Sequence, residues 1–324
     1  MHGMRAAQIQ TLTGPADITV AEVPEPTPGP DDVLIDVHCV GVSFPDLLLS
    51  KGEYQLKPDL PFSPGVDVSG TVISGPGFTP GQRVAGVSAY GGAAERAVVP
   101  AMFTFALPEL VTFEEGAALP MNYLTAEFAL HERGDLTSSE TVLVHGAAGG
   151  LGTATIQVAK GMGARVIGVV STEEKAEVAR AAGADEAILL DGFKERVSEL
   201  TGGHGVDVVA DIVGGAAFTD SLRVLGTQGR LLVLGFASGD GIPEVRVNRL
   251  LLNNVDVRGV GWGAYAMARP GYMQEQWARL VPMMAAGAVK PPIGARYELA
   301  DFGRALDDMA QRRTLGKSVV RVRD

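Results

Sequence analysis

The sequence of 324 residues contains one cysteine, Cys39, and only five histidines. One cysteine cannot form an intramolecular disulfide, which fits a reducing compartment, and it cannot build a zinc site with several cysteine ligands. The histidines show no metal-ligand spacing with Cys39, so we predict no metal site. Cys39 falls on the apolar face of the alternating segment 33–40 and is expected in the core rather than as a reactive thiol.

Positive charge is scarce as well. The chain has 27 Lys and Arg against 38 Asp and Glu, a formal net charge of −11. Binding to nucleic acid or to an anionic membrane surface needs clustered Lys and Arg, so neither partner is expected. No apolar run reaches membrane-spanning length, and the first ten residues lack the apolar core of a signal peptide. A cytoplasmic location is therefore expected.

Two domains are expected, because 324 residues is long for a single core. Residues 4–99 contain short alternating runs separated by Pro and Gly clusters, a pattern that suggests a small β-barrel. Between residues 141 and 260, six apolar strands alternate with helices, which predicts a parallel sheet covered on both faces. Two amphipathic helices, Met273–Ala285 and Leu299–Gln311, and an alternating run, Lys317–Val322, should pack back on the N-terminal region.

The stretch 139–160 organises the chain. An apolar run, Thr141–Val144, leads into a glycine-rich turn, and a helical pattern follows. Glycines let backbone N–H groups approach a pyrophosphate, and the helix N-terminus favours the anion. The spacing G-x-x-G-x-x-G arises by chance in so glycine-rich a chain, so the strand and helix around it carry the prediction; the alternative is a tight turn with no ligand. The predicted phosphate-binding residues are Gly146, Ala148, Gly149, Gly150, Leu151 and Gly152.

The end of the next strand bears on the choice of cofactor. An acidic residue there would bind the ribose hydroxyls of NADH, but the strand runs into Ser171 and Thr172 instead. Ser171 can donate to a 2′-phosphate and Lys175 can reach it as a point charge, which favours NADPH. Glu173 and Glu174 weaken this argument because either can turn toward the ribose. The alternative for Lys175 is a solvated lysine on the helix surface.

At this point the chain resembles the zinc-independent quinone oxidoreductase (zeta-crystallin-like) branch of the medium-chain dehydrogenase/reductase superfamily. The resemblance covers essentially the whole chain. It includes supporting segments at 60–65, 123–126, 211–215 and 316–320. The residues that match the signature of this branch are Ser139, Glu140, Leu143, Ala147, Ala148, Gly149, Gly150, Gly152, Gln157 and Lys160.

The same resemblance implies that two zinc-ligand positions are lost in this chain. Where the zinc enzymes of the superfamily carry a catalytic cysteine, this chain has Ser43, and where they carry a histidine ligand it has Val66 followed by Asp67. The lobe with four structural cysteines is also missing. The resemblance therefore implies chemistry without zinc, although Ser43 itself stands where this branch usually has asparagine.

The fold that the resemblance implies is α/β. It combines a Rossmann doubly wound parallel sheet with a β-rich GroES-like catalytic domain. The implied catalytic domain covers residues 1–121 and returns at 262–324. The implied NADPH-binding Rossmann domain covers residues 122–261.

The resemblance also assigns residues to roles. Ser43 or Tyr54 would hydrogen-bond the acceptor carbonyl as negative charge develops, and Thr125 would lie near the nicotinamide. Tyr54 has an alternative as a rim aromatic without a catalytic part, and Trp262 has one as a packing residue. The full set of implied cofactor-binding residues outside the turn is Thr125, Ser171, Lys175, Phe236, Ser238, Trp262 and Arg312.

The activity implied is hydride transfer from NADPH to a quinone or a similar conjugated carbonyl acceptor. A reductase of enals or enoyl thioesters is one alternative, since it shares the fold and the hydride step. A non-enzymatic NADPH-binding structural or sensory protein is another. The resemblance also implies a homodimer, formed through the edge strand near 255–260.

Overall fold

The computed structural model describes residues 3–323, and the described chain falls into two compact units. The first unit takes residues 3–121, 271–277 and 291–323. The second unit takes residues 122–270 and 278–290. The first unit is therefore assembled from segments that are distant in the sequence.

The second unit extends further than the expected return at residue 262. Residues 262–270 belong to it because the Tyr265 ring lies 4.9 Å from that of Phe128 and its hydroxyl donates to Glu132 at 3.0 Å. Residues 278–290 belong to it as well, and Arg279 makes an ion pair with the nearly buried carboxylate of Glu127. Packing of aromatic and charged side chains against 127–132 thus moves this boundary.

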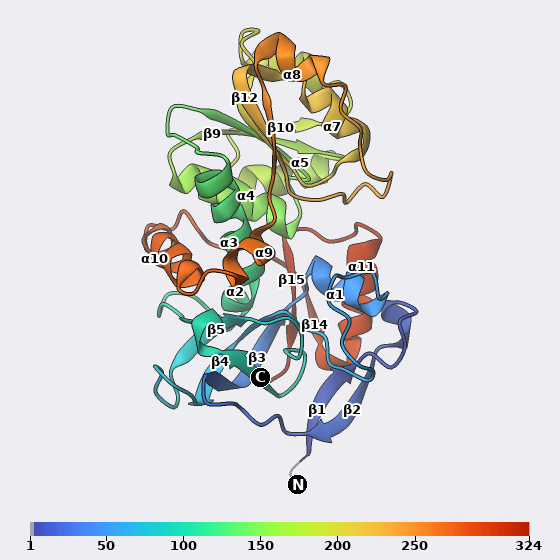
Figure 1. Ribbon diagram of the computed structural model, residues 1–324, viewed down its shortest axis with the longest axis vertical. Coiled ribbons are helices and arrows are strands. Elements are labelled where there is room, and N and C mark those ends of the chain that lie inside the picture. The colour runs from blue at the N-terminus through green and yellow to red at the C-terminus, as the bar shows by residue number, and fades with distance from the viewer. Residues whose placement is uncertain (1–2, 324) are drawn as a thin grey trace. The chain divides into compact units, whose positions relative to one another are not determined.

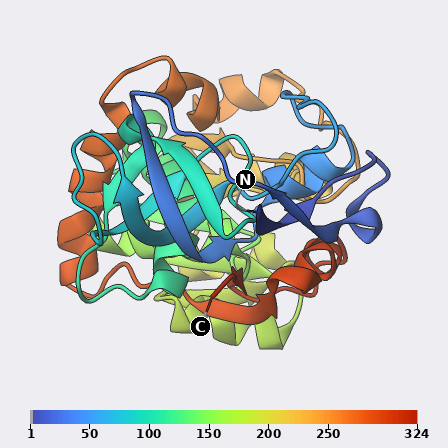
Figure 2. The same cartoon turned by 90° about the horizontal axis from the view of Figure 1, so that it is seen from below.

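The first unit is built on β-sheet (Figure 2). A seven-stranded sheet has the order β14-β15-β3-β4-β5-β7, with β6 paired to β3, and β1 and β2 form a separate antiparallel pair. Its strands are β1 (Gly3–Gln8), β2 (Thr19–Pro24), β3 (Asp32–Gly41), β4 (Asp67–Ser74), β5 (Arg83–Val87), β6 (Arg96–Pro100), β7 (Thr104–Ala106), β14 (Ile293–Glu298) and β15 (Lys317–Arg321).

Alternation along β3 explains the core of this unit. Val33, Ile35 and Val37 are fully buried and Cys39 is nearly so, while the residues between them are half-buried. Burial raises the pKa of the Cys39 thiol to about 12, so the thiol stays protonated and is a packing group. The expected core position of Cys39 is confirmed.

The C-terminal tail completes this sheet. Strand β15 pairs antiparallel with β3, in the register Val319 to Gly41, and parallel with β14. The expectation that the tail packs back on the N-terminal region is confirmed for residues 291–323, but residues 278–290, most of the expected helix Met273–Ala285, belong to the second unit. The strands β7 and β14 are short or irregular and were not predicted. The helices of this unit are η1 (Pro15–Asp17), α1 (Phe44–Ser50), η2 (Ala101–Phe103), α2 (Phe113–Ala118), η4 (Leu299–Asp301) and α11 (Phe302–Ala310).

The second unit contains a six-stranded parallel sheet in the order β10-β9-β8-β11-β12-β13 (Figure 1). This is the doubly wound order 3-2-1-4-5-6 of dinucleotide-binding sheets, so the expected fold class is confirmed. The strands are β8 (Thr141–His145), β9 (Arg165–Val170), β10 (Glu186–Leu189), β11 (Val206–Asp211), β12 (Leu225–Val233) and β13 (Asp256–Gly259).

Helices cover the sheet, and two of them begin after residues that favour a helix start. The side chain of Thr172 accepts from the Lys175 N–H and caps α5, while Gly149 precedes α4. The helices that involve this unit are α3 (Pro120–Glu127), α4 (Gly150–Gly161), α5 (Glu173–Ala181), α6 (Phe193–Leu200), α7 (Gly215–Ser221), α8 (Asn248–Asn253), α9 (Trp262–Met267) and α10 (Tyr272–Ala285), of which α3 and α10 start in the first unit.

The segment after α3 differs from the expected polar loop at 130–138. A π-helix, η3 (Phe128–Arg133), continues α3. Its apolar residues Phe128, Ala129 and Leu130 are fully or almost fully buried. Burial of this apolar stretch outweighs the polar residues that follow it, and the loop begins only at Gly134.

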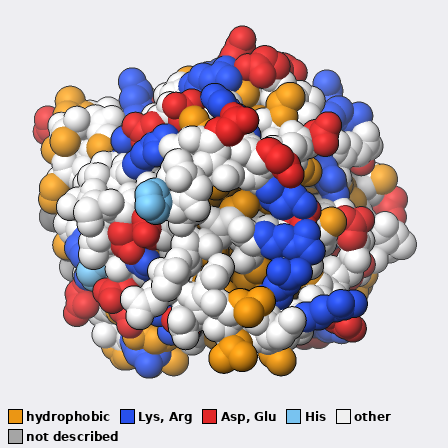
Figure 3. All heavy atoms as spheres, turned by 90° about the horizontal axis from the view of Figure 1, so that it is seen from above, with side chains coloured by type: hydrophobic (Ala, Val, Ile, Leu, Met, Phe, Trp, Pro, Cys, Tyr) orange, Lys and Arg blue, Asp and Glu red, His pale blue; other side chains and the backbone are white. Residues whose placement is uncertain are grey.

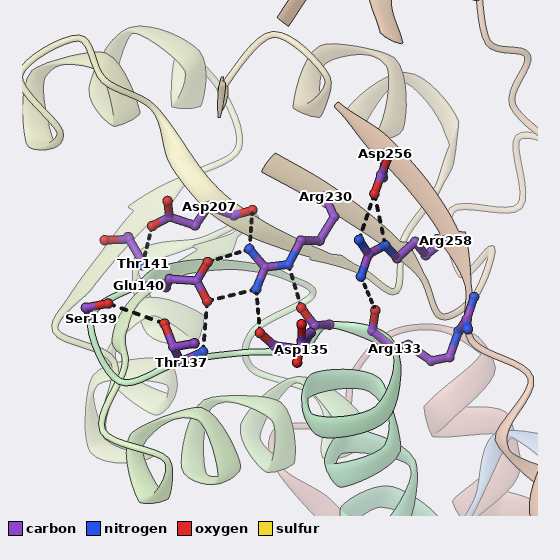
Figure 4. Close-up of polar contacts among 11 residues, drawn as sticks. Arg133, Asp135, Thr137, Ser139, Glu140, Thr141, Asp207, Arg230, Asp256 and Arg258 are labelled. Carbon is purple, nitrogen blue, oxygen red and sulfur yellow. Dashed lines mark hydrogen bonds and ion pairs between the residues drawn. The ribbon is translucent and has the colours of Figure 1, made fainter. Parts of the chain in front are cut away.

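A buried arginine fastens that loop to the amino ends of the parallel strands (Figure 4). Arg230 on β12 is 8% exposed and donates to the carbonyl oxygens of Gly134 and Asp135 and to both oxygens of Glu140. The N–H of Thr141, which begins β8, donates to Asp207 of β11 at 2.8 Å. This cluster lies at the edge of the sheet opposite to the glycine turn, which follows β8.

Within residues 3–323, no helix is long and apolar enough to cross a membrane.

Replacing Arg230 by Met should lower the free energy of unfolding by about 3 kcal/mol, because several loop acceptors lose their buried donor. Hydrogen bonds from Arg230 lower the pKa of Glu140. The ion pair therefore contributes its full stabilisation at pH values above the ordinary pKa of a glutamate. The difference in free energy of unfolding between wild type and variant should shrink as the pH falls from there through the lowered pKa of Glu140.

Urea unfolding over a pH series measures this difference. Arg223→Met is the control, because its contact with Asp220 is exposed and 3.4 Å long and should contribute less than about 0.5 kcal/mol. Equal losses in the two variants would contradict the assignment.

Candidate functional site

The glycine turn joins β8 to α4 at the carboxyl edge of the parallel sheet. Gly146 has a φ of 63°, which an L side chain rarely adopts, and the Gly149 N–H donates to the Gly146 carbonyl at 3.1 Å. The first N–H groups of α4 have no carbonyl partner within the helix. They come from Gly150, Leu151 and Gly152, at the positive end of a helix of 12 residues.

Gly152 makes the closest approach in this turn. A Cβ there would lie 2.1 Å from the Gly146 carbonyl oxygen and 2.8 Å from the Ala147 Cα. No side chain fits, so glycine lets the first turn of α4 press against the turn. A Cβ on Gly149 would lie 3.6 Å from the same oxygen, an ordinary contact. Close packing therefore requires glycine at position 152 but not at position 149.

Asp211 reaches this edge from the neighbouring strand. Asp211 ends β11 and accepts from the N–H groups of Val213 and Gly214, each at 2.9 Å. This holds the turn before α7 in place beside Gly146, whose Cβ would lie 3.4 Å from Val213. Burial raises the pKa of the Asp211 carboxyl, and the two N–H donors oppose that shift.

Ser171 and Lys175 lie together. The Lys175 ammonium donates to the Ser171 hydroxyl at 3.2 Å, and Ser171 immediately follows β9. Ser171 is exposed and Lys175 half-buried. A hydroxyl and an ammonium side by side at a strand end suit a phosphate.

A hollow lies next to the end of β10. Its volume is about 360 Å³, and Leu190, Phe193 and Ala217 contribute to its walls. Lys194 and Asp220, which also line it, form an ion pair at 3.1 Å. A hollow of this volume is large enough for a flat ring.

The other predicted cofactor residues lie on several elements. Phe236 is exposed and packs near Gly214, and the Ser238 N–H donates to the Val213 carbonyl at 2.8 Å. These two therefore border the same turn as Asp211. Trp262 begins α9 and is 5% exposed, Thr125 lies on α3, and Arg312 lies in the first unit with a φ of 57°. The predicted roles of these residues stay predictions.

The first unit holds a buried polar network that contains Ser43. The Ser43 hydroxyl donates to Asp67 Oδ2 at 2.7 Å and accepts from Lys317 Nζ at 2.5 Å. Lys317 also donates to Asp67 Oδ2 at 3.0 Å, and the Met121 N–H donates to Asp67 Oδ1 at 2.8 Å. All three side chains are at least 97% buried. Ser43 is therefore engaged inside the protein, so direct hydrogen bonding to an acceptor stays a prediction.

Asp46 links this network to Tyr54. Its carboxylate accepts from the Ser43 N–H at 3.1 Å and the Gly65 N–H at 2.7 Å. Burial raises the pKa of Asp46 to about 7, helped by the charge of Asp67 and opposed by the N–H donors and by Lys317. Tyr54 is half-buried and packs against an apolar cluster, and burial together with Asp46 raises the pKa of its phenol.

Asp67 and Lys317 were not predicted as site residues. A signal for both was present, since each is a charged residue set against an apolar strand: Asp67 lies between Val66 and Val68, and Lys317 precedes Val319 and Val320. A charge on such a strand needs a buried partner. Nothing local in the sequence says that the two charges meet.

Among residues 3–323, no three His, Cys, Asp or Glu side chains are grouped so that they could hold a metal ion. His2, one of the five histidines, lies outside the described residues.

Comparison with known proteins gives a consistent result. Residues 29–109 match the alcohol dehydrogenase GroES-like domain, and residues 150–286 match a family described as zinc-binding dehydrogenase. The chain is 37% identical over 320 residues to quinone oxidoreductase-like protein 2 of Rattus norvegicus, covering 97% of this chain and 91% of that one.

Solved structures resemble the whole chain. A probable oxidoreductase from Mycobacterium abscessus has a TM-score of 0.91 and 42% identity, with 99% of both chains covered. A mycobacterial protein solved in complex with NADPH has a TM-score of 0.89 and 35% identity, covering 98% of this chain and 100% of that one.

Replacing Gly152 by Ala should lower the free energy of unfolding by about 1–3 kcal/mol, because the new Cβ displaces backbone. Gly149→Ala is the matched control and should be close to neutral, since its Cβ meets only an ordinary contact. Thermal and urea unfolding without added cofactor measure both. A Gly152→Ala protein as stable as Gly149→Ala would refute the close packing of this turn.

Proposed function

Because this chain belongs to the quinone oxidoreductase-like members of the medium-chain dehydrogenase/reductase superfamily, we propose that it transfers hydride from NADPH to a quinone or a similar conjugated carbonyl compound. By this membership it is an oxidoreductase that uses NADPH. The observation that carries the choice of cofactor is the pairing of the glycine turn with Ser171 and Lys175 at one edge of one sheet.

The residues of the second unit fit the cofactor in separate parts. The N–H groups that begin α4 bind the pyrophosphate, and Ser171 with Lys175 binds the 2′-phosphate. The hollow beside Leu190 takes the adenine ring. NADPH supplies the hydride, and these contacts orient it.

The acceptor belongs with the first unit. Phe44, Leu56 and Leu60, in the segment that also holds Ser43 and Tyr54, are 42–48% exposed, and so is Tyr90, whose ring lies 5.8 Å from that of Phe62. Such a surface suits an apolar, electron-poor ring or enone. Tyr54 then donates to the acceptor carbonyl as negative charge develops on it.

We further propose that the reaction needs no zinc. The Ser43 hydroxyl holds the Lys317 ammonium at 2.5 Å, and a positive charge at that place repels a metal cation. Neither Ser43 nor Val66 is a usual zinc ligand.

A panel of acceptors tests the activity. Oxidation of NADPH is followed by absorbance with 1,4-benzoquinone, 9,10-phenanthrenequinone, an alkenal and a crotonyl thioester. We expect turnover of the quinones, with NADPH preferred over NADH. Lys175→Ala should raise KM for NADPH by about 10–100-fold, as loss of a charged hydrogen bond predicts, and leave KM for NADH nearly unchanged.

Arg180→Ala is the control, because Arg180 lies on the same helix but pairs with Glu173. Turnover of only the alkenal or the thioester would favour an enal or enoyl-thioester reductase. Tight binding of NADPH without turnover of any acceptor would favour a structural or sensory protein. An unchanged KM in Lys175→Ala would remove the 2′-phosphate assignment.

We also propose a homodimer that forms through the edge of the second unit. Strand β13 ends the sheet, and the neighbouring segment exposes Ile242, Val247, Leu251 and Leu252 by 67–76%. Figure 3 views the molecule from above and shows apolar side chains at the surface between charged ones. A second copy would cover these side chains and extend the sheet.

Light scattering after gel filtration should give about twice the chain mass of 33.8 kDa for the wild type. Leu251→Glu should shift the protein toward the monomer, since it places charge in the apolar contact. Leu110→Glu is the control, as Leu110 is 80% exposed in the other unit. A monomeric wild type, or a Leu251→Glu dimer as stable as the wild type, would overturn this interface.

A further inference from the structure

The network of Ser43, Asp67 and Lys317 joins the ends of three elements. Ser43 follows β3 and precedes α1, Asp67 begins β4, and Lys317 begins β15. Gly41 leaves room for it, because a Cβ there would lie 3.0 Å from both Asp67 Cβ and Lys317 Cε. The backbone thus makes space for a lysine side chain to cross β3 and reach Ser43.

Stability alone does not explain a buried ion pair of this kind. Lys317 is 3% and Asp67 0% exposed, so both charges have lost their hydration. Replacing such pairs by apolar groups is often neutral or stabilising. The Lys317 ammonium, which donates to the Ser43 hydroxyl, is therefore a candidate for a role besides stabilising the fold.

The geometry assigns a direction to the protons. Lys317 has no acceptor capacity, so it donates to Ser43 Oγ, and Ser43 must donate its own proton onward. In the structure that proton goes to Asp67. Rotation about the Ser43 Cβ–Oγ bond turns it elsewhere while Lys317 keeps both of its contacts. Ser43 is 2% exposed and the next residue along the chain, Phe44, is 48% exposed, so one residue separates the buried network from the surface.

We propose that Lys317 supplies, through the Ser43 hydroxyl, the proton that the reduced acceptor takes up. This rests on the proposed function. When the acceptor gains hydride from NADPH, the displaced electron pair ends on its carbonyl oxygen. The Ser43 O–H bond breaks as the acceptor O–H bond forms, and a Lys317 N–H bond breaks as Ser43 regains its proton.

The relay must regain its proton after each turnover, and two carboxylates lie beside Lys317. Lys317 takes a proton back from water after each turnover, while the Met121 N–H donates to Asp67. Asp67 and Asp46 are the ionisable side chains that act on this lysine within the network. Lys317 is a positioning and proton-supplying residue that acts through Ser43.

Three variants test the relay. In Lys317→Arg the charge remains, but a guanidinium does not release its proton, so kcat should fall by about 10²–10⁴-fold. Ser43→Ala should cause a similar fall, and Ser43→Ala combined with Lys317→Arg should be no slower than either single variant. The Kd for NADPH, measured by fluorescence, should stay within about twofold in all three.

The pH profile separates the relay from a structural role. The relay requires kcat to fall at high pH in the wild type, and this fall should be absent in Lys317→Arg. Ser50→Ala is the control, because Ser50 is a buried serine on the same helix whose hydroxyl donates to the Leu47 carbonyl. It should keep the wild-type kcat.

The outcomes are distinct. Additive losses in the double variant, or a high-pH fall that survives in Lys317→Arg, would overturn the relay and leave the proposed function standing. A wild type that reduces no acceptor of the panel would overturn both. If Lys317→Arg does not fold, Ser43→Ala decides: a wild-type kcat in that variant would overturn the relay.

Discussion

The first unit depends on the pairing of β15 with β3. This contact brings a segment near residue 320 against one near residue 40 and closes the seven-stranded sheet. It also carries Lys317 to Asp67, so the same pairing that completes the hydrophobic core creates a buried ion pair. Without β15, Asp67 would be left as a buried carboxylate without its cation, which is costly. Fold and site are therefore stabilised together in this unit.

In the second unit, the carboxyl edge and the amino edge of the parallel sheet have different roles. At the carboxyl edge, the N–H groups that begin α4 and the hydroxyl–ammonium pair of Ser171 and Lys175 lie at the ends of strands. At the amino edge, Arg230 uses its donors on loop carbonyls and on Glu140. One edge is thus held together by internal hydrogen bonds, and the other carries the turn at which open parallel sheets bind their ligands.

The fold class was predictable because periodicity is local. The alternation in β3 and the strand–turn–helix pattern at 141–160 each lie within one stretch of chain, and both are confirmed. The π-helix after α3 was not predictable, since burial of Phe128 and Leu130 comes from tertiary packing. Ser43 was found from its sequence position, but its partners were not. Asp67 and Lys317 are 250 residues apart, and only the sheet register brings them together.

That separation in sequence has a consequence for how the protein is made. Residues 122–270 lie between the two halves of the first unit, so a ribosome finishes most of the nucleotide-binding sheet before it supplies β14 and β15. Strand pairs between segments so distant in the sequence form late in folding. The nascent chain would thus hold a nearly complete second unit while the first still exposes the edge of β3. During synthesis, chaperones would find their main target in the N-terminal sheet rather than in the Rossmann sheet.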